Sequence, residues 1–295
     1  MGAYAFHVVG VYFRQLPHMK ARLRPAALLL VAAVASGCRL VALGDVHGDI
    51  GNARRALHAT GIVDGDGHWA GGCATLVQTG DVVDRGLESL GALRYFARLQ
   101  QEARVAGGEV VLLLGNHEMM NLAGDVRFVN PDEMKAVGGE DAWKALFAPG
   151  GEFRELLKDR PILVIRNDTV FVHAGLLPDW AAMGPAALNK LATEHIAHGR
   201  WNEGVLSDDG PTWTRKIVLH GHKGQCAELD AALTLMGASR MVVGHTVQMN
   251  KQINVLCSGR LVCIDTGMST LMMNVPSALE VIDELSVRPI YPKPE

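Results

Sequence analysis

Five short segments of the chain carry side chains of the types that bind metal ions or transfer protons. A glycine stands close to the polar residues in each segment. The residues are Asp45 and His47, then Asp81, Asp84 and Arg85, then Asn116 and His117, then His173, and finally His245. Glycine beside one polar residue is ordinary turn chemistry, so no single segment is informative alone. Their order and combination predict one shared site.

The donor atoms in these segments belong to carboxylates, imidazoles and an amide. Such donors suit hard or borderline divalent cations, namely Mn, Fe, Zn or Co. Cysteine is not needed for this set, and the five cysteines (38, 73, 226, 257 and 263) show no zinc-binding spacing. We expect buried free thiols. If the chain is exported and Cys38 is removed or acylated, the other four would be able to form disulfides.

Short apolar runs precede the polar segments and predict the strands that position them. Residues 39–43, 75–79 and 110–114 each lead into one of the glycine-containing loops, and helical patterns follow at 50–60 and 87–105. The alternation predicts a β/α architecture with polar groups at the strand ends. Further strands are expected at 162–165, 170–172, 241–243, 261–264 and 279–282, further helices within 131–147 and at 151–158 and 226–236, and an irregular helical insertion at 181–223.

These motifs resemble the calcineurin-like metallophosphoesterases, specifically the PPP-type phosphoprotein phosphatases, over residues 39–285. The likeness is closer to the Shewanella-like protein phosphatases, as carried by residues 116–122 (NHEMMNL), 124–127 (GDVR) and 241–246 (MVVGHT). The resemblance implies an α/β (α+β) fold, a four-layer αββα sandwich of two mixed β-sheets flanked by helices. It also implies that the site lies at the strand ends.

The resemblance implies a centre of two divalent metal ions, of which Mn is the ion expected to support activity in vitro. Two adjacent cations lower the pKa of a shared water and neutralise charge on a phosphate. A bridging hydroxide would then attack phosphorus in line, without a phospho-enzyme. By this resemblance one metal is held by Asp45 and His47, the other by Asn116, His173 and His245, and Asp81 bridges the two.

The resemblance also assigns residues that act on the substrate. His117 would protonate the leaving group, and Asp84 would orient its imidazole. Arg85 would clamp the phosphate, because a planar guanidinium meets two phosphate oxygens at once. Arg215 matches a second phosphate arginine, in a looser motif.

Other polar residues near these motifs have structural interpretations. Glu118 is expected to support the metal ligands rather than to bind metal. Asp265 follows a predicted strand and is expected to order the loop near His245. His195 and His198 are expected on a helix surface. The pair His220 and His222 resembles a metal pair but is expected in a solvated loop.

Composition excludes some classes of protein. The 295 residues are 48% hydrophobic and 20% charged, with a net charge of −3 and no basic run, so we expect a globular protein that does not bind nucleic acid. The motifs span one catalytic domain. The predicted division is an N-terminal extension at 1–38, the catalytic domain at 39–285 and a C-terminal tail at 286–295.

The N-terminal extension has the layout of a signal peptide at residues 19–35, with a basic start after Met19, an apolar run and Ala33-Val34-Ala35 as cleavage site. We therefore expect translation to start at Met19 and the protein to be exported or periplasmic. Contact with the membrane would be transient, through this segment only. Two alternatives stay open: acylation of Cys38, as in a lipoprotein, and a buried helix or strand at 25–38, which would leave the protein cytoplasmic.

The resulting functional hypothesis is a phosphomonoester hydrolase acting on a phosphorylated protein or peptide. A nucleotide or dinucleoside polyphosphate phosphoesterase is the alternative, because one fold serves many small phosphoester substrates. A scaffold protein on a decayed enzyme fold is the third hypothesis, and the complete set of metal-ligand residues argues against it.

Overall fold

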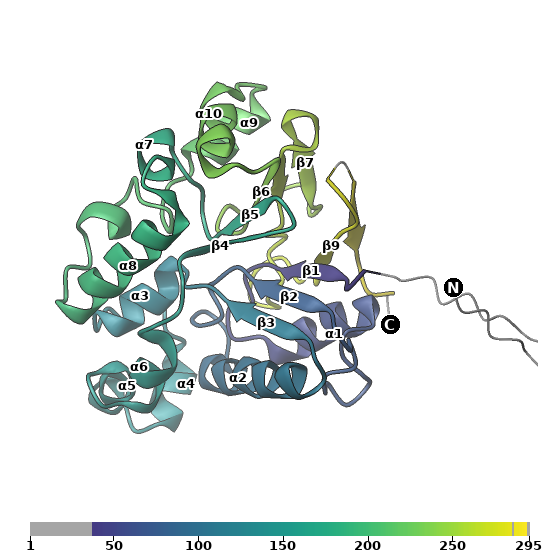
Figure 1. Cartoon of the computed structure of the whole chain (residues 1–295). Coiled ribbons are helices and arrows are strands. Elements are labelled where there is room, and N and C mark those ends of the chain that lie inside the picture. The colour runs from purple at the N-terminus through teal and green to yellow at the C-terminus, as the bar shows by residue number, and fades with distance from the viewer. Residues whose placement is uncertain (1–36, 285, 294–295) are drawn as a thin grey trace, which may run out of the picture. The chain divides into compact units, whose positions relative to one another are not determined.

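The computed structural model describes residues 37–284 and 286–293. The predicted signal peptide at 19–35 lies outside the described residues. Two five-stranded mixed sheets form the centre of the described chain (Figure 1). Among the described residues, no helix has the length and apolar character that crossing a membrane requires.

The first sheet has the strand order β10-β9-β1-β2-β3. Its parallel part consists of β1 (Leu40–Leu43), β2 (Thr75–Gln78) and β3 (Glu109–Leu112). The strands β9 (Ala278–Val281) and β10 (Val287–Ile290) pair antiparallel at the other edge. Strand β10 lies in the segment predicted as a tail, so that prediction was wrong. Its own pattern is short and interrupted by Pro289, which gives little sequence signal for a strand.

The second sheet has the order β4-β5-β6-β8-β7. Strands β5 (Thr169–Val172), β6 (Arg240–Val243) and β8 (Leu261–Cys263) run parallel in its centre. Antiparallel strands close both edges, namely β4 (Leu163–Arg166) and β7 (Asn254–Leu256). The parallel strands of each sheet therefore end at one edge, where their following loops can meet.

The hydrophobic side chains of the strands alternate between the two faces of each sheet and so belong to two separate buried clusters. Leu40 and Val77 of the first sheet share one buried cluster with Phe171, Val242 and Val262 of the second, so the sheets pack face to face. Helices α1 (Ile50–Thr60) and α2 (Ser89–Val105) cover the outer face of the first sheet (Figure 1). Helices α8 (Gly184–Ala197) and α10 (Ala227–Met236) lie on the side of the second. The predicted αββα sandwich is confirmed.

Local sequence signals explain where α1 begins and ends. The Asp49 carboxylate accepts a hydrogen bond from the Asn52 N–H at its start, and Gly61 ends it in the left-handed conformation.

The other helices of the described chain are α3 (Asn116–Leu122), α4 (Pro131–Ala136), α5 (Glu140–Phe147), α6 (Glu152–Leu157), α7 (Pro178–Ala181) and α9 (Lys216–His222), with 3₁₀ turns η1 (Gly204–Leu206) and η2 (Cys257–Gly259).

Four of the five cysteines form disulfides, Cys38 with Cys73 and Cys226 with Cys257. Cys263 is free and buried. The expectation of free thiols was therefore wrong for four cysteines. The partners are 35 and 31 residues apart in the chain, and only the fold brings them together.

Candidate functional site

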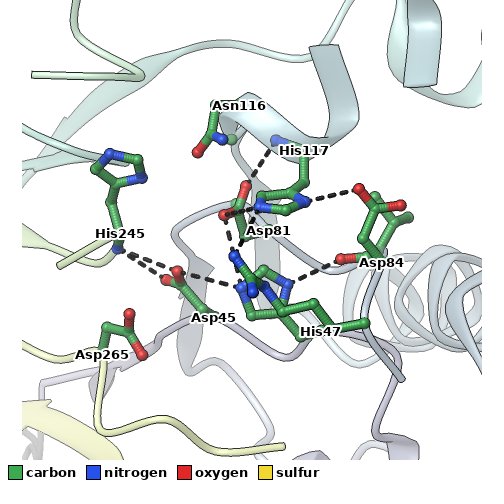
Figure 2. Close-up of polar contacts among 12 residues, drawn as sticks. Asp45, His47, Asp81, Asp84, Asn116, His117, His245 and Asp265 are labelled. Carbon is green, nitrogen blue, oxygen red and sulfur yellow. Dashed lines mark hydrogen bonds and ion pairs between the residues drawn. The ribbon is translucent and has the colours of Figure 1, made fainter. Parts of the chain in front are cut away.

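All six predicted metal ligands meet at the edge of the sandwich where the parallel strands end. Asp45 and His47 follow β1, Asp81 follows β2, Asn116 follows β3, His173 follows β5 and His245 follows β6. Figure 2 shows Asp45, His47, Asp81, Asn116 and His245 gathered in one place. Each of these side chains is buried, the most exposed being His245 at 6%. Buried carboxylates and imidazoles require partners, and here they face one another.

Asp81 is the centre of this group. Its Oδ2 atom lies 3.3 Å from Nε2 of His173 and 3.8 Å from Nε2 of His47. Nε2 of His117 is also 3.8 Å away, on the side toward the opening. One carboxylate oxygen thus faces nitrogen atoms from two loops and from the start of α3, which is the position expected of a bridging ligand.

Backbone carbonyls orient the imidazole rings. Nδ1 of His47 lies 3.0 Å from the Val83 carbonyl, and Nδ1 of His173 lies 2.9 Å from that of Thr79. In His245 the other nitrogen, Nε2, lies 2.9 Å from the Trp213 carbonyl. A ring N–H that donates to a carbonyl leaves the second nitrogen as a lone-pair donor, the arrangement found in metal-bound histidines.

The donors form two groups that share Asp81. On one side, His173 Nε2 lies 3.0 Å from Asn116 Oδ1 and 3.2 Å from His245 Nδ1. On the other side, His47 Nε2 lies 3.9 Å from Asp45 Oδ2. Two groups of these side chains converge closely enough to hold a metal ion, namely Asp81, His173 and His245, and His47, Asp81 and His117. Their carboxylate and imidazole donors are of the types that divalent cations take.

The glycines before the ligands are required by close packing of the loops. A Cβ atom on Gly115 would collide with the Asp81 carboxylate, and one on Gly244 would collide with that of Asp45. The ligand backbones are also unusual, since His47, Asp81 and His245 have positive φ angles of 47°, 56° and 62°. Such strain in non-glycine residues is concentrated at functional sites.

Glu118 fixes the loop that carries Asp81. Its carboxylate accepts hydrogen bonds from the N–H groups of Asp81 at 2.8 Å, Val82 at 2.7 Å and Gly115 at 2.8 Å. It is fully buried and donates no ligand atom to the cluster. These hydrogen bonds are the contacts that the predicted supporting role requires.

The buried charges perturb one another strongly. Burial lowers the pKa of His47 to about 3 and that of His245 to about 2. Burial is also the largest influence on His173 and lowers its pKa, but the charge and hydrogen bond of Asp81 and the charges of Asp45 and Glu118 together outweigh it and raise the pKa to about 9. Burial and the charge of Asp265 raise the pKa of Asp45. Cations bound here would supply the positive charge that these carboxylates lack.

His117 is part of a hydrogen-bonded chain that leads away from the metal ligands. Its Nδ1 lies 2.6 Å from Asp84 Oδ2, and the Asn121 amide donates to Asp84 Oδ1 at 2.8 Å. The Trp143 indole N–H donates to Asn121 Oδ1 at 2.7 Å. Burial lowers the pKa of His117, but Asp81 and Asp84 together raise it above its ordinary value. Sequence reasoning missed Asn121, although it stands one helical turn after His117.

Both predicted phosphate arginines line the same cleft. The Arg85 guanidinium lies 5.2 Å from the centre of the Phe128 ring, and its buried Nε has no acceptor among the described residues. Arg215 donates through Nη1 to the His245 carbonyl at 2.7 Å. Unpaired guanidinium donors next to a cation site favour an anionic ligand such as phosphate.

The cleft has a volume of about 330 Å³ and combines polar and aromatic walls. Besides the predicted residues, Phe128, Trp213, Met272 and Asp265 line it. The two aromatic residues and the methionine gave no sequence signal, because hydrophobic residues in loops are common and their direction depends on the fold.

The four histidines at 195, 198, 220 and 222 do not line the cleft. His195 is buried, with Nδ1 3.0 Å from the Glu203 carbonyl, so the surface prediction was wrong for it, whereas His198 is exposed. His220 lies 2.8 Å from Glu228 and His222 lies 2.9 Å from Gln248. These contacts are with ordinary polar side chains and not with the metal ligands.

The fold and the convergence of these donors define a metallophosphoesterase, a hydrolase of phosphoric esters. The chain belongs to the calcineurin-like phosphoesterase family, whose model matches residues 38–249. It is 33% identical to Shewanella-like protein phosphatase 2 of Arabidopsis thaliana, over 87% of this chain and 78% of that one.

Two further likenesses bear on the site. The structure of a cold-active protein-tyrosine phosphatase from a psychrophilic Shewanella species superposes with a TM-score of 0.71 and 27% identity, covering 85% of this chain and 80% of the other. A symmetrical bis(5'-nucleosyl)-tetraphosphatase of Janthinobacterium is 33% identical, but only over 40% of this chain and 39% of its own.

Proposed function

We propose that the protein is a phosphoprotein phosphatase with a two-metal centre. The observation that carries the proposal is the position of Asp81, whose Oδ2 faces His47 and His173 in two donor groups, with His117 on the open side. A single buried carboxylate shared by two groups of donors is suited to two cations. Manganese fits the carboxylate, amide and imidazole donors and is the ion we propose for activity in vitro.

The bound cations would activate a water molecule and neutralise the charge on the phosphate. The protein's own residues bind the phosphate and protonate the leaving group. Arg85, which packs against Phe128, and Arg215 both line the cleft, and the buried Nε of Arg85 has no acceptor among the described residues. His117, held by Asp84, carries the proton that the departing alkoxide or phenoxide needs.

A protein substrate is favoured over a nucleotide by both the comparisons and the cleft. The likeness to relatives named as protein phosphatases extends over most of the chain, whereas the likeness to the tetraphosphatase covers 40% of it. Phe128 and Trp213 supply apolar walls next to the phosphate arginines. Aromatic walls pack well against an aromatic ring, so we propose phosphotyrosine as the preferred residue.

The test is a comparison of substrates after reconstitution with Mn²⁺. We expect the highest kcat/KM for phosphotyrosine peptides, lower values for phosphoserine and phosphothreonine peptides, and the lowest for diadenosine tetraphosphate and mononucleotides. A preference for the nucleotides would overturn the protein-phosphatase proposal. If the purified protein takes up no divalent metal and hydrolyses no p-nitrophenyl phosphate, the proposal of a two-metal phosphatase is wrong.

We also propose that the protein is exported. The signal-peptide pattern at 19–35 motivates this, and the two disulfides add support, because disulfides persist mainly in oxidising compartments. The Cys38–Cys73 bond uses the sulfur atom that acylation of Cys38 would need, which favours a soluble exported form over a lipoprotein. N-terminal sequencing and peptide mapping of the non-reduced protein test this. A mature chain that retains residues 1–18, or a lipid on Cys38, would contradict it.

A further inference from the structure

Asp265 is a buried carboxylate that the metal-ligand set leaves without a role. It follows β8, is 1% exposed and lines the cleft beside Asp45 (Figure 2). Its Oδ1 accepts the N–H of Gly267 at 2.9 Å, but Oδ2 has no donor among the described residues. A buried acceptor without a donor costs roughly 1–3 kcal/mol and therefore calls for an explanation.

The place of Asp265 beside Asp45 in the cleft makes a cation at the neighbouring ligands the best explanation of this unpaired oxygen. Its carboxyl group faces that of Asp45, close enough for the two to interact directly. Asp81 adds a third carboxylate to this part of the cluster. A divalent cation held by Asp45 would bring its coordinated water molecules next to Asp265, and such a water can donate the hydrogen bond that Oδ2 lacks.

The loop around Asp265 is fixed firmly enough to keep this arrangement. The Asp265 carbonyl accepts the N–H of Gln248 at 2.8 Å. The Asn52 amide at the start of α1 donates to the Met268 carbonyl at 2.8 Å, and the Thr270 N–H donates to Asp49 at 2.8 Å. The carboxylate is thus held against Asp45 by contacts that do not involve the metal ligands.

We propose that Asp265 is a positioning residue of the metal centre, which raises the affinity for the cation held by Asp45, His47 and Asp81. Its free Oδ2 is the acceptor that a water molecule in the coordination shell of that cation requires. Supporting carboxylates of this kind typically contribute 10-fold to 100-fold in metal affinity. The inference rests on the proposed two-metal function and extends it to a residue outside the predicted ligand set.

The experiment measures metal affinity rather than activity. Metal-free wild type, Asp265→Asn and Asp265→Ala are titrated with Mn²⁺ by calorimetry, and bound metal is counted after dialysis. We expect one of two sites to weaken by about 10-fold or more in both variants, while the other site keeps its affinity. Asn retains the bond from Gly267 and the side-chain volume, so its effect reports on charge and not on folding.

Two control variants distinguish a specific effect of Asp265 on metal binding from a general effect of replacing an aspartate. Asp84→Asn removes another buried carboxylate, which contacts His117 and not Asp45, and should keep both metals. Asp66→Asn changes an exposed aspartate and should leave metal binding and activity unchanged. If wild type binds two metals and the Asp265 variants bind both within about twofold of its affinity, the inference is wrong and the proposed function stands. If wild type binds none, the proposed function itself fails.

Discussion

Nδ1 of His117 lies 2.6 Å from Oδ2 of Asp84, and both side chains are buried. The contact orients the imidazole so that Nε2 points into the cleft, 3.8 Å from Asp81 Oδ2 and 3.4 Å from the Arg85 guanidinium. A histidine in this position has two possible roles, as a proton donor to the leaving group or as an additional metal ligand. The two roles make different predictions for its replacement.

Replacement of His117 by Asn should separate these roles. As a proton donor, His117 contributes most when the leaving group is poor, so kcat should fall by about 10²-fold to 10⁴-fold for alkyl phosphates and far less for p-nitrophenyl phosphate. Metal content should stay at the wild-type value. A series of phosphates with graded leaving-group pKa measures this, with the exposed His198→Asn as control. Equal losses across the series, together with loss of metal, would assign His117 to the metal.

Replacement of Arg85 by Lys should weaken binding of the phosphate. Lysine keeps the charge but cannot present two parallel N–H groups or stack on Phe128 in the same way, so we expect kcat/KM to fall by about 10²-fold and inhibition by inorganic phosphate to weaken. A matched control is Arg94→Lys, because Arg94 also stacks on a phenylalanine, Phe153 at 5.0 Å, but on the surface of α2. Unchanged inhibition by phosphate in Arg85→Lys would rule out the clamp.

The sequence predicted the position of the site better than its surroundings. Polar residues that follow apolar runs must lie at strand ends, and Asp45, Asp81 and Asn116 do so because β1, β2 and β3 are parallel neighbours. That inference needs only the local pattern and the rule that parallel strands end at one edge. The second sheet contributes His173 and His245 by the same rule.

The features that escaped prediction depend on contacts between distant segments. Strand β10 is recognisable only as the partner of β9, and the disulfides only from the proximity of Cys38 to Cys73 and of Cys226 to Cys257. His195 was expected at the surface because it lies about one turn from His198 on a predicted helix. The turn after α8 folds back and buries it, with Gly204 packed against its ring.

Replacement of Gly244 by Ala tests whether close loop packing is needed for metal binding. The added methyl group would collide with Asp45 and approach Thr79 Oγ1 to 3.0 Å, so the Asp45 carboxylate must move. Displacement of a reacting group by about 1 Å can cost 10²-fold in rate, and we expect a loss of about that size with weakened metal binding. Gly65→Ala is the control, since nothing lies within 4 Å of a Cβ there. Wild-type metal affinity in Gly244→Ala would show that the loops can adjust.

The stability of the first sheet should depend on pH through Glu280. This buried carboxylate on β9 pairs with Arg39 before β1, at 2.5 Å, and with Arg288 on β10. Burial raises its pKa, but the two arginines outweigh this and hold it below the ordinary value of 4.5. A lowered pKa in the folded state means that the ionised form stabilises the fold above about pH 4.5, and that this contribution disappears as pH falls through the folded-state pKa.

Glu280→Gln should therefore lower the free energy of unfolding at pH 7 by about 1–3 kcal/mol, with a smaller difference from wild type at pH 3. Urea unfolding at several pH values measures this, with the exposed Glu194→Gln as control, and a difference that does not shrink in acid would contradict the assignment.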